Sequence, residues 1–237
     1  MLRPLIFFAI IVVVLIYYRD SSTTPPARTP PPALRPTPAV PVSESLRTSH
    51  RRTVAVGDLH SDLAQALAVL RMAGIVDNDS NWSGGSATLV QTGDIVDRGP
   101  DTIALYNLFD KLRTQAKEAG GEVVNVFGNH EVMNLGGDLR YVTEEDYASF
   151  GGRQKRREAW DVRSGWLGKQ IFGQFNITYV HHGHTVFSHG DMEAEWAQLG
   201  VEEMNDLAHE AIWNSNYRAP IFQGTGPIWS RSHALLE

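Results

Sequence analysis

The sequence predicts an α/β fold for residues 51–237, and two observations lead to that class. Short apolar runs alternate with amphipathic segments in the order strand, helix, strand, helix, strand. Each apolar run also ends at a glycine followed by a polar residue. This alternation is typical of neighbouring parallel strands joined by helices.

The first three strands and two helices follow directly from hydrophobic periodicity. The predicted strands are Thr53–Val56, Ala87–Gln91 and Val123–Phe127, and the predicted helices are Asp62–Ala73 and Asp101–Ala119. Both helices are followed by glycine, which commonly ends a helix.

The second half of the chain predicts a hairpin and one more helix. Ile177–Val180 and Thr185–Ser188 are apolar runs on either side of a turn at His182-Gly183, which is typical of paired antiparallel strands. Val201–Asn214 has the apolar spacing of a helix.

Composition excludes several classes of chemistry. The chain has 237 residues, a net charge of −6 and no cysteine, so a cysteine nucleophile, thiolate metal ligands and disulfides are all excluded. The densest basic cluster, residues 153–157, is predicted to be a solvated face, and no nucleic-acid partner is expected.

Two segments precede the predicted domain. Residues 1–19 contain the uncharged apolar run Leu5–Tyr18, which predicts an N-terminal signal anchor or transmembrane helix. The expected location is the membrane, single-pass, with a lumenal or extracellular catalytic domain; a cleaved signal peptide and secretion is the alternative. Residues 20–50 hold eight of the twelve prolines and predict a disordered stalk.

Polar side chains follow each of the first three predicted strands. Their sequences are GDLH at residues 57–60, GDIVDRG at 93–99 and GNHE at 128–131, and a fourth cluster, SHGD, follows the hairpin at 188–191. In open α/β sheets, ligands bind at the carboxyl ends of the strands. Carboxylate, imidazole and amide groups are ligands of hard or borderline divalent cations. The clusters therefore predict a metal site at one edge of the sheet.

These motifs closely resemble the signature of the phosphoprotein phosphatase branch of the calcineurin-like metallophosphoesterases. The stretch GNHEVMNLGGDLRYV, residues 128–142, looks most like the Shewanella-like protein phosphatases. The resemblance implies an α/β/β/α sandwich, here without its last C-terminal strands, with residues 51–237 as one metallophosphoesterase domain.

The resemblance also implies metal ligands. It assigns Asp58 and His60 to the first metal, Asp94 to both metals as the bridging carboxylate, and Asn129 and His189 to the second metal. The expected cofactors are two divalent ions, manganese foremost, with iron or zinc as alternatives.

The same resemblance implies the remaining roles. His130 matches the general acid, Asp97 matches the carboxylate that orients it, and Arg98 and Arg231 match phosphate-binding arginines. The implied function is a metal-dependent phosphomonoesterase, serine/threonine protein phosphatase-like, in which the dinuclear site activates water for in-line attack. The substrate would be a phosphorylated protein or a small phosphate ester. The alternatives are a dinucleoside polyphosphate hydrolase and an inactive, truncated metal- or phosphate-binding module.

The sequence departs from the family pattern in three places. Ser61 and Asp191 stand where the family usually has glycine, and the chain ends six residues after Arg231, before a further histidine ligand of the family. The domain is therefore expected to be truncated at its C-terminus. His184 resembles that late histidine in its local sequence, but it lies in the predicted hairpin turn and is expected to be a turn residue.

Overall fold

The computed structural model describes residues 52–232. The predicted anchor at residues 1–19 and the predicted stalk at 20–50 lie outside the described residues. Between residues 52 and 232, no helix is long and apolar enough to cross a membrane. The longest, α2, has 17 residues and is polar on one face. No described helix therefore supports the predicted transmembrane helix and membrane location, and both predictions are corrected.

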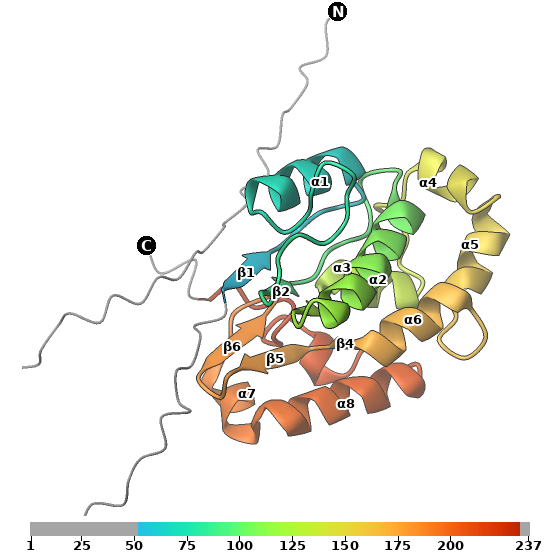
Figure 1. The fold of residues 1–237 in the computed structure, drawn as a ribbon. Helices are drawn as coiled ribbons and strands as arrows, with labels where there is room; N and C mark the ends of the chain where they lie inside the picture. The colour runs from blue at the N-terminus through green and yellow to red at the C-terminus, as the bar shows by residue number, and fades with distance from the viewer. Residues whose placement is uncertain (1–51, 233–237) are drawn as a thin grey trace, which may run out of the picture.

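The described chain alternates strands and helices and then adds a hairpin and a helical pair (Figure 1). The strands are β1 (Thr53–Val56), β2 (Thr88–Gln91), β3 (Glu122–Val126), β4 (Phe175–Asn176), β5 (Thr178–His181) and β6 (Thr185–Ser188). The helices are α1 (Leu63–Met72), α2 (Thr102–Glu118), α3 (Asn129–Leu135), α4 (Glu144–Ser149), α5 (Arg153–Trp160), α6 (Trp166–Gln174), α7 (Ala194–Leu199), α8 (Val201–Trp213) and the 3₁₀ turn Pro220–Phe222.

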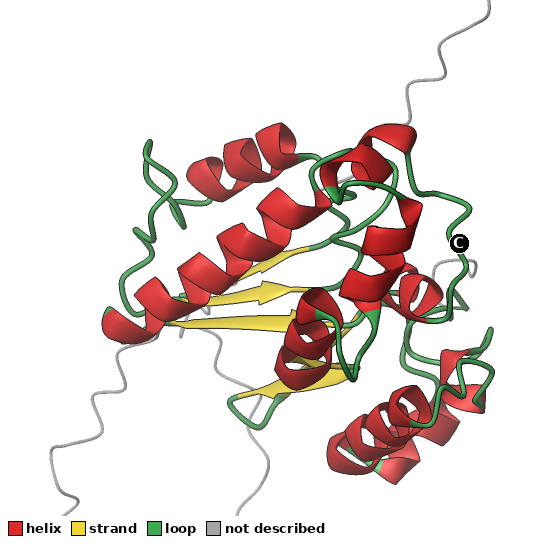
Figure 2. Cartoon of the chain, turned by 90° about the vertical axis from the view of Figure 1, so that its right-hand side faces the viewer, coloured by secondary structure: helices red, strands yellow, loops and turns green. Residues whose placement is uncertain are grey.

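The first four strands form one parallel sheet in the order β1-β2-β3-β4, visible as adjacent arrows in Figure 2. Val56 pairs with Gln91, and Gln91 pairs with Asn125, so the first three strands end at the same edge. All four residues of β2 are buried, as expected for a strand covered on both faces. The predicted α/β class with a parallel sheet is confirmed.

Helix α2 forms because its apolar residues recur at helical spacing. Leu105, Phe109, Leu112 and Ala116 are all buried along one face, which packs against β3. In Figure 1, α2 lies to the right of β1 and β2, and α8 runs along the bottom of the view, below β5 and β6.

The second sheet is the antiparallel pair β5 and β6, which match the two predicted hairpin strands. Helix α8 packs against β4 and β5, and β5 contacts β3. The layers therefore run helix, sheet, sheet, helix, and the second sheet has two strands within residues 52–232.

Sequence periodicity missed the short helices α4, α5 and α6 on the right of Figure 1. It was also wrong about part of the basic cluster at residues 153–157, because Arg156 is only 1% exposed. Its Nε donates to Asp146 Oδ2 at 2.8 Å, and Tyr147, Phe150 and Trp160 surround its guanidinium group. A buried carboxylate ten residues earlier offsets the cost of burying this charge.

Candidate functional site

The candidate site forms where β1, β2 and β3 end. Six of the nine non-glycine residues with positive φ in the described part of the chain lie in the turns after β1 and β2. They are Asp58, His60, Ser61, Asp94, Asp97 and Arg98. Such backbone strain is unusual outside glycine, and it concentrates at sites where side chains must converge.

Glycines allow these turns to approach one another. A Cβ on Gly93 would lie 2.5 Å from Gly128 Cα, and a Cβ on Gly128 would lie 2.1 Å from Asp94 Oδ1. Neither position has room for a side chain. The close approach brings the end of β2 against the start of α3, and the N–H of His130 donates to Asp94 Oδ1 at 3.0 Å.

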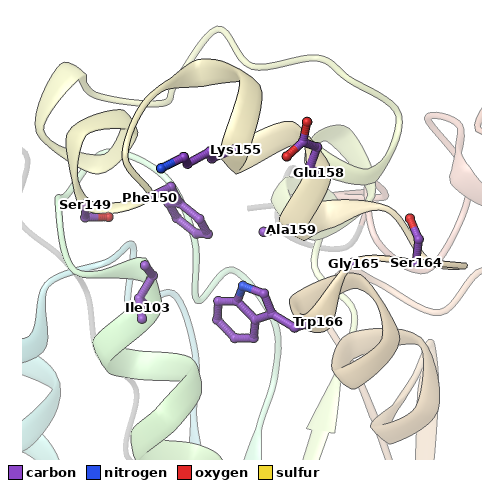
Figure 3. Close-up of a pocket in the computed structure, with 9 residues that line it drawn as sticks. All are labelled: Ile103, Ser149, Phe150, Lys155, Glu158, Ala159, Ser164, Gly165 and Trp166. Atoms are coloured by element: carbon purple, nitrogen blue, oxygen red, sulfur yellow. The ribbon is translucent and has the colours of Figure 1, made fainter.

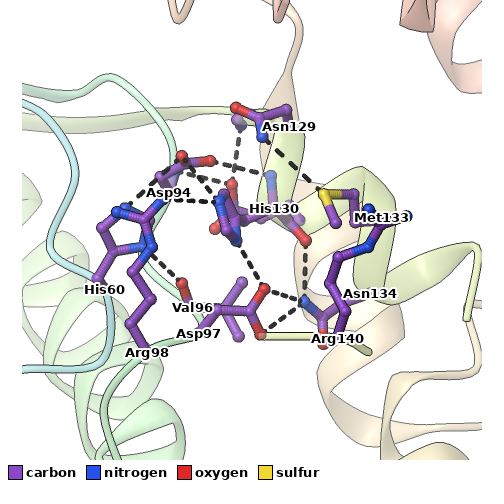
Figure 4. A network of polar contacts seen from close by, with 12 residues as sticks. His60, Asp94, Val96, Asp97, Arg98, Asn129, His130, Met133, Asn134 and Arg140 are labelled. Carbon is purple, nitrogen blue, oxygen red and sulfur yellow. Dashed lines mark hydrogen bonds and ion pairs between the residues drawn. The ribbon is translucent and has the colours of Figure 1, made fainter. Parts of the chain in front are cut away.

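Asp94 stands at the centre of the site (Figure 4). Its Oδ2 lies 3.9 Å from His60 Nε2, 3.9 Å from His130 Nε2 and 3.4 Å from His189 Nε2. Asp58 borders the same space, with its two oxygens 3.9 Å from His60 Nε2 and His189 Nδ1. The structure therefore brings the carboxylates and imidazoles predicted from four separate motifs into one cluster.

Backbone carbonyls orient two of the imidazoles. His60 Nδ1 lies 3.0 Å from the carbonyl of Val96, and His189 Nδ1 lies 2.9 Å from that of Thr92. Donation from Nδ1 leaves the lone pair on Nε2, which faces Asp94 in both rings. Burial is the main cause that lowers the pKa of His60 and of His189, so both rings favour the neutral form that can bind a metal.

The donor set fits divalent cations. Two groups of side chains have ligand atoms within 4.8 Å of one another: His60, Asp94 and His130; and Asp58, Asp94 and His189. His60 Nε2 is buried and has no hydrogen-bond partner, which a metal ion would supply. Burial is the main cause, and the charge of Glu131 the second, that raises the pKa of Asp94 to about 8. A positive charge nearby, such as a bound cation, would favour the ionised form of this carboxyl.

Asn129 belongs to the same region. Its side-chain oxygen lies 2.9 Å from His189 Nε2, so both predicted ligands of the second metal point into one place.

His130 is held by a buried carboxylate. Its Nδ1 lies 2.7 Å from Asp97 Oδ2, and Asn134 Nδ2 donates to both oxygens of Asp97 at 3.0 Å. Burial alone would lower the pKa of His130, but the hydrogen bond to Asp97 and the neighbouring carboxylates outweigh it and raise the pKa above its ordinary value. The ring therefore retains a proton more readily than a free imidazole.

The two predicted arginines reach the site from different elements. Arg98 Nη2 lies 3.4 Å from His130 Nε2, and Arg231 Nη2 lies 3.3 Å from His189 Nε2. Both guanidinium groups therefore border the imidazole cluster and could bind an anion there. His184, in contrast, lies in the hairpin turn, where its Nδ1 meets the hydroxyl of Thr185, and it joins neither group of candidate ligands.

Sequence reasoning gave no role to Glu131, which holds the site together from behind. This fully buried carboxylate accepts from the backbone N–H groups of Asp94, Ile95 and Gly128 at 2.8 Å each, and from Tyr106 Oη at 3.1 Å. It thereby links the ends of β2 and β3. A sequence signal for this role was available. In GNHE the glutamate is the third residue of helix α3, a position from which its side chain can accept from backbone N–H groups at the start of the helix.

Ser61 has positive φ, as the glycine usual at that place would allow, and its hydroxyl lies 2.8 Å from that of Thr102. Asp191 is not among the residues with positive φ between residues 52 and 232, so its backbone does not require glycine.

Comparison with known proteins agrees with this geometry. A family model described as calcineurin-like phosphoesterase matches residues 51–234. An uncharacterised protein of Schizosaccharomyces pombe is 39% identical over 77% of the chain and 58% of its own length. Shewanella-like protein phosphatase 2 of Arabidopsis thaliana is 30% identical over 76% of the chain and 57% of its own length.

A solved structure of a cold-active protein-tyrosine phosphatase from a psychrophilic Shewanella species superimposes with a TM-score of 0.66 at 28% identity. The match covers 77% of this chain and 57% of that chain, so the chain spans a little under three fifths of the length of each of these three proteins. The extent of the family match, together with the parallel sheet and its edge site, shows that this chain belongs to the calcineurin-like phosphoesterase family.

Proposed function

We propose that this chain is a metal-dependent phosphomonoesterase that acts on phosphorylated protein side chains. The proposal rests on the imidazole and guanidinium groups that surround the carboxylate of Asp94. One carboxylate oxygen lies within 3.9 Å of three imidazole Nε2 atoms, and Arg98 and Arg231 border the same cluster. A cation-binding centre flanked by two guanidinium groups suits a phosphate ester.

The ligands would divide between two cations that share Asp94. Asp58 and His60 would hold one, and Asn129 and His189 would hold the other. When bound, divalent cations in this position supply Lewis acidity and lower the pKa of an attacking water. We propose manganese, since the donors are oxygens and imidazoles without thiolates.

His130 would protonate the leaving oxygen. Because Nδ1 is committed to Asp97, the second proton of a protonated ring lies on Nε2, which faces Asp94 and Arg98. The hydrogen bond from Nδ1 to Asp97 raises the pKa of His130 and so favours the protonated ring that this role needs. Arg98 and Arg231 would bind the phosphate oxygens and stabilise the charge that develops on them.

The comparisons guide the choice of substrate. Two solved structures are described as cold-active protein tyrosine phosphatases, one of them from Shewanella, whereas the Arabidopsis relative is described as a Shewanella-like protein phosphatase. We therefore propose phosphotyrosine as the substrate class, in place of the phosphoserine or phosphothreonine expected from the motifs alone.

The test uses the full chain and O-phosphotyrosine, with released phosphate as the readout. Hydrolysis should disappear after treatment with a chelator and return when manganese is added, and elemental analysis should find about two metals per chain. Hydrolysis that continues unchanged after the metal has been removed would contradict the proposal. A chain that binds metal but hydrolyses no phosphate ester would instead be a binding module.

A further inference from the structure

The ring of Tyr141 borders the candidate site, on the loop between α3 and α4. Its centroid is 5.0 Å from that of the His130 ring, and the guanidinium carbon of Arg98 lies 5.8 Å from it. Tyr141 is nevertheless 43% exposed. An aromatic ring therefore contacts both the proposed acid and a proposed phosphate ligand while part of it stays open to an incoming molecule.

Backbone hydrogen bonds attach the loop that carries Tyr141 to the site. The N–H of Arg98 donates to the carbonyl of Tyr141 at 2.9 Å, so the loop is attached to the turn that carries the arginine. The loop also closes on itself, with the N–H of Val142 donating to the carbonyl of Leu139 at 3.2 Å. Substitution of the tyrosine side chain leaves both of these bonds in place.

We propose that Tyr141 is a specificity-determining residue that packs against the leaving group of the substrate and favours aromatic phosphate esters. This inference rests on the proposed function. A leaving oxygen that takes a proton from His130 must come within about 3 Å of its Nε2. Because the ring of Tyr141 contacts the ring of His130, the carbon bonded to that oxygen, and the rest of the leaving group, would then lie near the ring of Tyr141. A phenyl leaving group gains a ring contact there, whereas the single methylene of serine offers little surface.

A second aromatic surface could compete for the same role. A hollow of about 450 Å³ borders Asn129 and is lined by Met133, Tyr217 and Trp229, among others, and Trp229 is 40% exposed. Tyr141 does not line it. We favour Tyr141 because it contacts the ring of His130, where the leaving oxygen must lie.

A third exposed aromatic residue serves as a control. Trp166 lines a hollow of about 480 Å³ between α4, α5 and α6, where it stacks on Phe150 (Figure 3). None of the candidate ligands or arginines lines this hollow. Loss of the Trp166 ring removes an exposed aromatic surface of similar kind without touching the site.

The test compares kcat/KM for O-phosphotyrosine and O-phosphoserine in the manganese-loaded full chain. Tyr141→Ala should lower the tyrosine-to-serine ratio by roughly 3- to 10-fold, the value of a typical aromatic contact. Tyr141→Phe should retain the ratio because it keeps the ring. Trp166→Ala should leave both rate constants unchanged.

The direction in which Tyr141→Ala changes the tyrosine-to-serine ratio of kcat/KM distinguishes a lost substrate contact from a disturbed His130. Alkoxides need the proton of His130 more than phenoxides do, so damage to that histidine raises the tyrosine-to-serine ratio. The inference is wrong if Tyr141→Ala raises the tyrosine-to-serine ratio or leaves it unchanged. In the second case, a lower ratio in Trp229→Ala would place the aromatic contact at Trp229, and an unchanged ratio would mean that neither ring sets the preference. The proposed function survives each of these results. If the wild-type chain hydrolyses neither ester with metal, the proposed function fails and the inference fails with it.

Discussion

At the scale of single residues, the site depends on groups that hold other groups. Two buried carboxylates do this: Glu131 accepts from the backbone N–H of Asp94, and Asp97 lies 2.7 Å from His130 Nδ1. The sequence motifs identified the residues that face the centre. They did not show which neighbours orient them, because orientation depends on distances between separate turns.

Glu131→Gln tests the residue that sequence reasoning left without a role. The substitution places an amide N–H₂ among donors that need an acceptor, in a fully buried position. We expect the free energy of unfolding to fall by about 2–4 kcal/mol, with weaker metal binding, measured by denaturant unfolding and elemental analysis. Glu118→Gln, on an exposed position of α2, is the matched control and should change neither quantity.

His130→Ala tests the proposed proton donor. We expect kcat to fall by roughly 10²- to 10⁴-fold with little change in KM, because the proton matters only as the bond to the leaving oxygen breaks. The loss should be larger for O-phosphoserine than for O-phosphotyrosine. Equal losses on both esters, measured in the same steady-state assay, would argue against a proton transfer from this ring.

At the scale of elements, the strongly periodic segments were predictable and the short helices were not. The structure confirms the helix predicted at Asp62–Ala73 as α1, with the side chain of Asp62 accepting from the N–H of Gln65 at 2.9 Å. Helix α5 was missed because its eight residues are nearly all charged or polar. It is instead held by tertiary contacts that no periodicity contains, among them the buried pairing of Arg156 with Asp146.

Arg156→Ala tests that pairing. Removal of the guanidinium group leaves Asp146 buried and unpaired, so we expect the free energy of unfolding to fall by about 3–5 kcal/mol. The comparison is Arg153→Ala, which breaks the exposed pair with Glu144 and should cost less than about 1 kcal/mol. Similar losses in both variants, by denaturant unfolding, would show that the buried pair has no special role.

Ser61 offers a test of the turn after β1. Ser61→Ala keeps the positive φ and loses the hydroxyl contact with Thr102, so we expect a loss of about 1 kcal/mol in the free energy of unfolding. Ser61→Gly loses the same contact but relieves backbone strain of about 1 kcal/mol, so its stability should lie close to that of the wild type. Denaturant unfolding measures both variants. A larger loss of unfolding free energy in Ser61→Gly than in Ser61→Ala would contradict this explanation of the turn.

At the scale of the whole molecule, the fold explains how distant motifs become one site. Three parallel strands end at one edge, and the hairpin of the second sheet adds His189 from the opposite layer. The meeting of the three motifs at one edge of the sheet could be predicted, because parallel strands run in the same direction and their carboxyl ends lie together. The placement of Tyr141 could not be predicted, since it lies on a segment without regular structure, whose course depends on contacts such as the hydrogen bond from the N–H of Arg98 to the carbonyl of Tyr141.

The measurement that tests the account most directly is the effect of Asp94→Asn on metal content and hydrolysis of O-phosphotyrosine in the full chain. Asn keeps the shape of the side chain and removes the charge that both cations would share. We expect hydrolysis to be abolished and bound manganese to fall well below two per chain, while Asp79→Asn, at an exposed position, retains both. Far-ultraviolet circular dichroism should show that the variant remains folded. Metal-dependent hydrolysis retained by folded Asp94→Asn would contradict the shared-carboxylate centre.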